Sequence, residues 1–353
     1  MKTILNKKNI DTTKQPLFLG EDLALQRYEK PKYESILKFY ERQLELYWRP
    51  NEVNISLDAA QFKMLPDHEK HIFTKNLQFQ TLMDSVISRG VPTITEYVSN
   101  PELEACLKAW EFFETLHSFS YTYIIKNIYP NPTEIMDQTL EDKEILARCD
   151  SVSQEYDRLR QCSNGDIKKQ IYLTLISVNI LEAIRFYVSF VCAFAFANNK
   201  KMVGNADIIK FIKRDELVHL SITQEIIRIL RENEEEGFQQ TIQDNKEEAV
   251  RMFKFAVDEE KEWSAYLFKD GGILGLNHEI VSKYIEWLAD LRLEQLKLPK
   301  QYDVKKSPIG GWITPWMDSD SVQVAPQESE ITSYKVFASK SDLSNSDFSD
   351  IEL

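Results

Sequence analysis

The segment EFFETLHSFSYTYII (residues 111–125) carries a Glu-x-x-His motif at Glu114–His117, and the segment RDELVHL (214–220) carries a second one at Glu216–His219. Residues three positions apart lie on the same face of an α-helix, so the Glu and His of each motif can point toward one metal ion. The two motifs therefore indicate two helices that each contribute a carboxylate and an imidazole to a metal site.

An acidic residue precedes each motif inside an apolar stretch: Asp84 lies in QFQTLMDSVIS and Glu182 lies in ISVNILEAIRFYVSF. The separations are similar, 30 residues in the first set (84 to 114) and 34 in the second (182 to 216). Charged residues are rarely buried unless they are paired or bind a metal. A carboxylate from each of two helices and Glu-x-x-His from each of two others is the ligand pattern of ferritin-like di-metal bundles. The sequence thus predicts six metal ligands, which are Asp84, Glu114, His117, Glu182, Glu216 and His219.

The composition indicates a large, mostly helical protein. Of its 353 residues 43% are hydrophobic, and only 10 are glycine and 12 are proline. A net charge of −13 disfavours binding to nucleic acid, because contact with phosphates needs a basic surface. The four cysteines show no CxxC spacing and the N-terminus MKTILNKKNIDTTKQ has no apolar signal region, so we expect a cytoplasmic protein with free thiols.

One apolar segment, residues 171–197, has the length of a membrane span. Asn179, Glu182 and Arg185 lie at its middle, where each charge would cost about 2.5–3.5 kcal/mol in a bilayer. We therefore expect a buried helix of the bundle and no membrane.

Periodicity and capping residues predict an all-α fold, a ferritin-like helical bundle with extra helices. Asp67 is expected to cap a helix that ends before Gly90 and Pro92, and Asn100 followed by Pro101 is a strong signal for the start of the next. The expected helices span residues 33–47, 67–89, 101–129, 140–160, 166–197, 205–231, 247–268 and 278–296.

Three parts of the chain differ in composition. Residues 1–30 are polar and weakly periodic, which is typical of an extended N-terminal arm, and residues 31–320 carry the expected di-metal helical domain. Residues 321–353 are rich in Ser, Asp and Glu and lack an apolar stripe, which favours a flexible C-terminal tail.

Hard oxygen ligands and two imidazoles favour iron or manganese, whereas thiolates would favour zinc or copper(I). Four carboxylates can offset the charge of two divalent ions and bridge them, and two histidines leave positions open for dioxygen. Tyr121 lies four residues after His117, on the same helix face one turn further on. A phenol beside a di-metal centre in a dry pocket can lose an electron and a proton to give a shielded radical. Apolar side chains at helical spacing from the ligands form either a candidate pocket around it or ordinary bundle core, which would look the same in the sequence: Phe186, Phe190 and Ile212.

The sequence resembles the small, radical-generating subunit of class I ribonucleotide reductase over nearly its whole length. Six motifs carry the resemblance: LYWRP (46–50), QTLMDS (80–85), EFFETLHSFSYTYII (111–125), SVNILEAIRFYVSF (177–190), RDELVHL (214–220) and VQVAPQESEITSY (322–334). The resemblance implies the same six metal ligands, two iron ions per chain and a stable tyrosyl radical on Tyr121. It also implies an internal electron route through Trp48, Asp215 and His117.

The resemblance further implies the partners of the chain. Tyr334 matches a tail tyrosine that hands the radical to the large catalytic subunit, Glu328 matches a tail glutamate, and the terminal DFSDIEL matches the segment that docks that subunit. A homodimer, dioxygen and an electron donor are implied as well. The resulting activity would be reduction of ribonucleoside diphosphates, or of triphosphates, to deoxyribonucleotides.

Two other functions share the metal residues. An iron-storage protein would need neither Tyr121 nor the tail, and a stand-alone di-iron oxidase would need a substrate channel but no docking tail. The tail favours the reductase subunit over both. The residues themselves leave manganese open as an alternative to iron.

Overall fold

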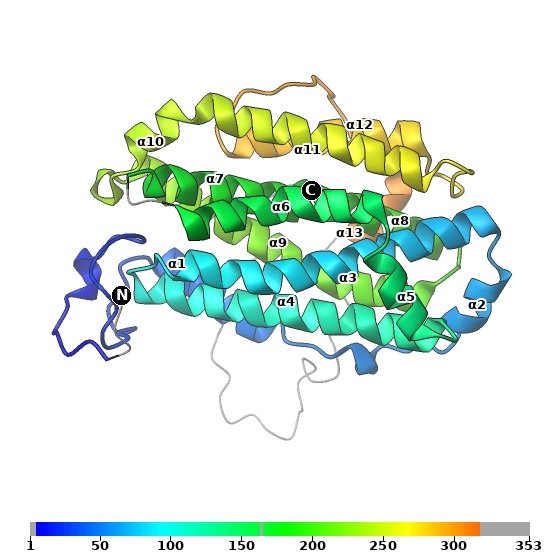
Figure 1. Ribbon diagram of the computed structural model, residues 1–353, viewed down its shortest axis with the longest axis horizontal. Helices are drawn as coiled ribbons and strands as arrows, with labels where there is room; N and C mark the ends of the chain where they lie inside the picture. The colour runs from blue at the N-terminus through cyan, green and yellow to red at the C-terminus, as the bar shows by residue number, and fades with distance from the viewer. Residues whose placement is uncertain (1–4, 163–164, 318–353) are drawn as a thin grey trace.

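The computed structural model describes residues 5–162 and 165–317, and within these it is a layered bundle of helices with no β-strand (Figure 1). Its only β pairings there are two isolated bridges, Phe18 with Val98 and Ile273 with Leu276. The all-α, ferritin-like class predicted from the sequence is confirmed.

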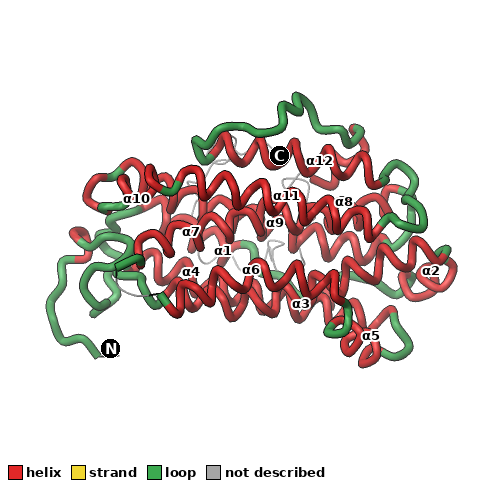
Figure 2. The backbone as a smooth tube through the Cα atoms, turned by 45° about the horizontal axis from the view of Figure 1, so that its top comes forward, coloured by secondary structure: helices red, strands yellow, loops and turns green. Residues whose placement is uncertain are grey.

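The centre of the bundle is built from four long helical segments that run along the longest axis of the molecule (Figures 1 and 2). These are α3 (Asp67–Thr95), α4 (Pro101–Ile128), the continuous segment α7 (Ile167–Ile180), η3 (Leu181–Arg185) and α8 (Phe186–Asn198), and α9 (Val203–Glu232). The helices α3 and α4 follow each other in an antiparallel hairpin, and α9 packs against α4, α7 and α8. The four segments supply all six of the predicted ligands.

Further helices enclose this centre. Helix α1 (Glu34–Glu45) lies against α4 and α9, α6 (Lys143–Gln161) lies against α3 and α7, and α11 (Lys246–Leu267) pairs with α12 (His278–Gln295) to form an outer layer. Four short helices, which the sequence analysis did not predict, are α2 (Asp58–Met64), α5 (Pro132–Thr139), α10 (Gln239–Asp244) and α13 (Thr314–Met317).

Helix α4 begins as predicted, with Asn100 as its cap and Pro101 as its first residue. The Asn100 side chain accepts a hydrogen bond of 2.9 Å from the Leu103 amide, and Pro101 occupies the first helical position, where its missing N–H costs nothing.

The predicted ends of α3 were wrong. Pro66, not Asp67, precedes the first turn, and the helix continues through Gly90 and Pro92 to Thr95. A side chain at position 90 would collide with the Tyr156 ring, 2.6 Å from where its Cβ would stand, so Gly90 serves close packing against α6 and does not end the helix. Pro92 lies in the last turn, where its missing N–H removes one i→i−4 hydrogen bond, and α3 continues past it to Thr95.

The long apolar helix was predicted to be continuous but contains a π-helical turn, η3. Its segment, Ile167–Asn198, has the length and mean hydropathy (1.8) of a membrane span, yet its apolar window is wholly buried inside the bundle. This supports the prediction of a buried core helix.

The N-terminal arm lacks α-helix over residues 5–30 but is fixed to the bundle. Leu17 and Phe18 are buried, the Leu19 amide donates to the Tyr97 carbonyl at 2.9 Å, and the Ser99 amide donates to the Leu17 carbonyl at 3.0 Å. The arm therefore packs along the loop between α3 and α4.

Candidate metal centre

The six predicted ligands meet at the middle of the bundle, and all six side chains are fully buried. They come from α3 (Asp84), α4 (Glu114 and His117), the π turn η3 (Glu182) and α9 (Glu216 and His219). Segments far apart in sequence thus converge on one point, as the sequence predicted.

The six residues form two overlapping groups, in each of which every residue offers a donor atom within 4.8 Å of the others. One group holds Asp84, Glu114, His117 and Glu216, and the other holds Glu114, Glu182, Glu216 and His219. Because Glu114 and Glu216 belong to both groups, the arrangement has room for two ions that share these two carboxylates.

Each Glu-x-x-His glutamate lies close to the histidine of the other motif. Glu216 Oε1 is 3.1 Å from His117 Nδ1, and Glu114 Oε1 is 3.0 Å from His219 Nδ1. His219 Nδ1 also lies 2.9 Å from Glu216 Oε2 of its own motif. The donor atoms of both motifs therefore face a common centre.

Several of these donor atoms lack a hydrogen bond. Both oxygens of Asp84 and of Glu182 and one oxygen of Glu114 have no hydrogen-bond partner among the described residues. Buried polar atoms without partners are costly, which indicates that such atoms are arranged for a ligand. Carboxylate oxygens and imidazole nitrogens suit iron or manganese, so these residues fit a pair of such ions.

The charges of the cluster depend on one another. Burial, together with the neighbouring Glu114 and Glu216, raises the pKa of Asp84 well above its usual range, and burial with Glu216 and Glu114 does the same for Glu182. Burial also disfavours the charged forms of Glu216 and His117, but their proximity overcomes this, lowering the pKa of Glu216 and raising that of His117. Without metal, the cluster must therefore hold protons that two divalent ions would displace.

A hydrogen-bonded path leads from His117 to a buried tryptophan. His117 Nε2 lies 3.1 Å from Asp215 Oδ2, and the Trp48 indole N–H donates to the same oxygen at 2.7 Å. Trp48 is fully buried, and its ring stacks on Phe211 with the centroids 5.2 Å apart. The three residues predicted to form the electron route are thus in direct contact.

Tyr121 lies on α4, one turn beyond His117, and is fully buried. Its hydroxyl has no hydrogen-bond partner among the residues that the structure describes. Burial raises the pKa of Tyr121 well above its usual range, and the charge of Asp84 adds to this effect. The phenol is therefore protonated at any ordinary pH.

The three predicted pocket residues, Phe186, Phe190 and Ile212, are also fully buried. The rings of Phe186 and Phe190 stack with their centroids 5.9 Å apart. Their burial fits the dry pocket expected around the ligands.

Trp110 contacts the cluster and was missed by the sequence analysis. Its indole N–H donates to Glu114 Oε1 at 2.6 Å, and its ring stacks on His219 with centroids 4.8 Å apart and planes 18° from parallel. Its position four residues before Glu114 places it on the ligand face, which was the available signal.

Comparison with known proteins agrees with this geometry. Residues 26–308 match the family described as ribonucleotide reductase, small chain. The chain is 42% identical to the ribonucleoside-diphosphate reductase subunit beta of Haemophilus influenzae, with 99% of both chains covered, and 40% identical to subunit beta of reductase 1 of Escherichia coli O157:H7 with the same coverage. Among solved structures it is similar to the ribonucleotide reductase R2 subunit from Clostridium botulinum, with a TM-score of 0.81, 29% identity, and coverage of 90% of this chain and 98% of that one.

The chain belongs to the ribonucleotide reductase small-chain family.

Family membership selects among the functions that the motifs left open. It makes this chain the small subunit of a class I ribonucleoside-diphosphate reductase, and it argues against an iron store or a stand-alone oxidase. Two predicted residues, Glu328 and Tyr334, and the predicted tail at 321–353 lie outside the described residues.

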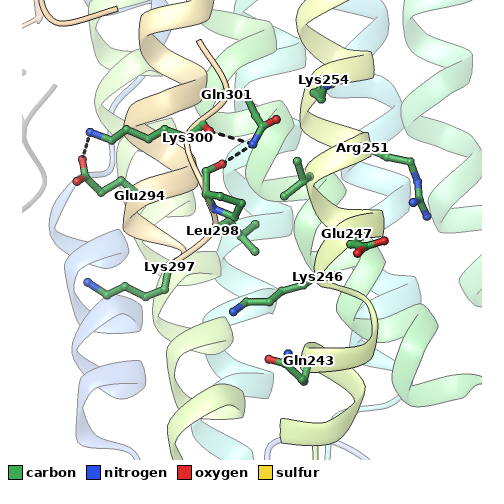
Figure 3. A pocket seen from close by; sticks show the side chains of 12 residues that line it. Gln243, Lys246, Glu247, Arg251, Lys254, Glu294, Lys297, Leu298, Lys300 and Gln301 are labelled. Atoms are coloured by element: carbon green, nitrogen blue, oxygen red, sulfur yellow. Dashed lines mark hydrogen bonds and ion pairs between the residues drawn. The ribbon is translucent and has the colours of Figure 1, made fainter. Parts of the chain in front are cut away.

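An open surface pocket lies apart from this centre, between α11 and the chain that follows α12 (Figure 3). Its lining carries more cations than carboxylates, with Glu294 paired to Lys300 at 2.8 Å, and none of the six predicted ligands contributes to it. The cations that line it are Lys246, Arg251, Lys254, Lys297 and Lys300. The chemistry of the buried cluster is therefore separate from this pocket.

Proposed function

We propose that the small subunit holds two iron ions at the six-residue cluster and stores a stable radical on Tyr121 for the large catalytic subunit. The observation that carries this proposal is the pair of buried donor groups that share Glu114 and Glu216. Two bound iron ions would activate dioxygen and accept the electron that Tyr121 loses. Manganese, which prefers the same donors, is the alternative metal.

The residues around Tyr121 suit storage of a radical. Tyr121 keeps its proton at rest because of its raised pKa, so oxidation removes one electron and one proton together and leaves a neutral radical. The fully buried ring has no contact with solvent, which protects that radical from quenching.

Reduction of dioxygen takes four electrons, of which two iron(II) ions would supply two and Tyr121 one. Trp48, Asp215 and His117 would conduct the remaining electron. Asp215 accepts hydrogen bonds from both rings, which fixes the indole and the imidazole on either side of one carboxylate. An external electron donor would deliver this electron, and the same path would later carry the radical toward the partner.

We propose that the large catalytic subunit binds the C-terminal residues of the chain, with Tyr334 as the radical carrier, Glu328 beside it, and DFSDIEL as the docking segment. This rests on the family resemblance of residues 322–353. The substrates reduced there would be ribonucleoside diphosphates, as the names of the relatives indicate, in the cytoplasm. Residues 31–320 would then be the radical-generating domain.

A homodimer is supported by exposed apolar side chains on one face of α1 and α4. Leu44 on α1 is 56% exposed, and Phe112 and Phe119 on α4 are 51% and 62% exposed. Phe112 and Phe119 are seven residues apart, about two helical turns, so they share a face. Large exposed apolar side chains that share a helix face favour contact with another protein, and we propose a second copy of the chain as its occupant.

The test is electron paramagnetic resonance on protein reconstituted with iron(II) and dioxygen. Wild-type protein should show an organic radical, and Tyr121→Phe should lose it while binding two iron ions, because only a hydroxyl is removed. Tyr156→Phe is the matched control, since Tyr156 is also buried and its hydroxyl also has no hydrogen-bond partner among the described residues. A radical that persists in Tyr121→Phe and disappears in Tyr156→Phe would show that Tyr156, not Tyr121, carries it.

A further inference from the structure

Glu182 lies in the one turn of the long apolar segment that departs from α-helical geometry. In η3 (Leu181–Arg185) the Phe186 amide bonds to the Leu181 carbonyl, five residues back instead of four. Such π turns are rare and often occur at functional sites. If this turn relaxed to an α-helix, the side chains on one side of it would rotate by about 100° relative to the other. Either Glu182 or the packing of Phe186 would then be misplaced.

Arg148 on α6 contacts this turn directly. Its Nη2 donates to the carbonyl oxygen of Arg185, the last residue of η3, at 2.9 Å. The same guanidinium donates two hydrogen bonds to the carboxylate of Glu260 on α11, from Nε to Oε1 at 2.8 Å and from Nη2 to Oε2. Arg148 and Glu260 thus join α6, α11 and the π turn at one point.

The pair is deeply buried and enclosed by aromatic rings. Arg148 is 3% exposed and Glu260 is not exposed, and the guanidinium carbon lies 3.5 Å from the centre of the Phe79 ring and 4.6 Å from that of Trp263. A buried ion pair contributes little to stability compared with apolar residues of the same size, because both charges lose their hydration. The ion pair of Arg148 and Glu260 is better explained by the position in which it holds the π turn.

The side chain of Arg185 is held as well. Its Nη2 donates to Ser151 Oγ at 3.0 Å and to Glu259 Oε2 at 2.5 Å, at the edge of a surface pocket. The backbone and the side chain of the last residue in η3 therefore both have fixed partners on α6 and α11.

We propose that Arg148 and Glu260 are positioning residues, which hold the π turn in place and thereby aim Glu182 at the metal centre before any metal binds. This rests on the proposed metal centre. Glu182 belongs to only one of the two donor groups, whereas Asp84 belongs to the other. Loss of the clamp formed by Arg148 and Glu260 should therefore weaken one metal position much more than its neighbour.

The experiment titrates metal-free protein with manganese(II) and follows the free ion by its electron paramagnetic resonance signal. Wild-type protein should bind two ions per chain, and failure to do so would refute the metal centre itself, whatever the variants do. In Arg148→Lys the charge remains but the forked contact to Glu260 and Arg185 is lost. Residues that orient metal ligands typically change metal affinity by about 10–100-fold, so one binding event should weaken by at least about tenfold and the other by less than threefold.

Arg158→Lys is the matched control, because Arg158 is on the same helix, has an exposed side chain and pairs with Glu155. It should bind both ions as wild type does. Equal affinities in Arg148→Lys and wild type, or equal weakening of both events, would overturn the proposal.

A second measurement does not depend on metal, and its first part needs no variant. Hydrogen exchange of metal-free wild-type protein should show slow exchange in peptides that cover residues 181–186, as slow as in the flanking helices. Fast exchange confined to this turn would overturn the proposal, because the clamp would then not order it. In Glu260→Gln, exchange there should rise by at least about tenfold while the flanking helices stay protected.

Discussion

Trp48→Phe tests the contact between the predicted electron route and the metal centre. The substitution keeps an aromatic ring against Phe211 but removes the indole N–H that donates to Asp215 Oδ2 at 2.7 Å. A buried hydrogen bond to a charged group contributes about 1.5–3 kcal/mol. The smaller ring leaves a cavity of about 40 Å³, which at about 24 cal/mol per Å³ costs about 1 kcal/mol more. We therefore expect the free energy of unfolding of the metal-free protein to fall by about 2.5–4 kcal/mol.

The assay is urea denaturation of metal-free protein, with Trp263→Phe as the control. Trp263 is also buried, but its indole nitrogen has no hydrogen-bond partner among the described residues, so its replacement should cost about 1 kcal/mol for the cavity plus part of the contact with the Arg148 guanidinium, 4.6 Å from its ring centre. The hydrogen bond of Trp48 should make the loss larger in Trp48→Phe than in Trp263→Phe. Equal losses in the two variants would refute its contribution.

The same variant tests function. Phenylalanine is much harder to oxidise than tryptophan, so Trp48→Phe should form the Tyr121 radical slowly after iron(II) and dioxygen are mixed. Radical formation at the wild-type rate would show that electrons reach the centre by another path.

Three further predictions follow from the proposed function. Glu114→Ala should reduce the iron content below one ion per chain, since Glu114 belongs to both donor groups, whereas Glu111→Ala on the same helix should keep two ions. Metal analysis of the purified proteins measures this, and two ions in Glu114→Ala would contradict the shared position of Glu114. Deletion of residues 340–353 should leave the iron and the radical intact but abolish turnover with the large subunit. Tyr334→Phe should still bind that subunit but fail to transfer the radical. Wild-type turnover of the truncated protein would contradict a docking role of the deleted residues. Phe112→Glu combined with Phe119→Glu should convert a dimer to a monomer in sedimentation equilibrium, while Phe255→Glu, also at an exposed phenylalanine, should not; an unchanged dimer would place the interface elsewhere.

The sequence was sufficient to predict the fold class and the set of residues at the centre. The i, i+3 spacing of each Glu-x-x-His motif constrains two side chains to one helix face, and an acidic residue in an apolar stretch has few alternatives to a buried partner. These are local rules, and they identified Asp84 and Glu182 as readily as the histidines. The functional roles assigned to these residues stay predictions.

Features that depend on contacts between helices could not be predicted in the same way. Gly90 and Pro92 are strong local signals for a helix end, but packing of Tyr156 against Gly90 outweighs them. The π turn leaves no mark on apolar periodicity, because the residues of η3 are buried on every side. Trp110 has the spacing of an ordinary core residue, and only the fold shows that its N–H contacts Glu114.

Because both donor groups contain Glu114 and Glu216, the centre cannot be completed early in synthesis on the ribosome. The two residues are 102 positions apart (216 − 114), which a ribosome working at 5–20 residues per second crosses in roughly 5–20 s. During that interval Asp84, Glu114 and His117 have been synthesised without the second half of their site, so neither metal position can be complete. Loading of the proposed metal centre must therefore await synthesis past His219, and a shorter nascent chain would be kept from the proposed oxygen chemistry.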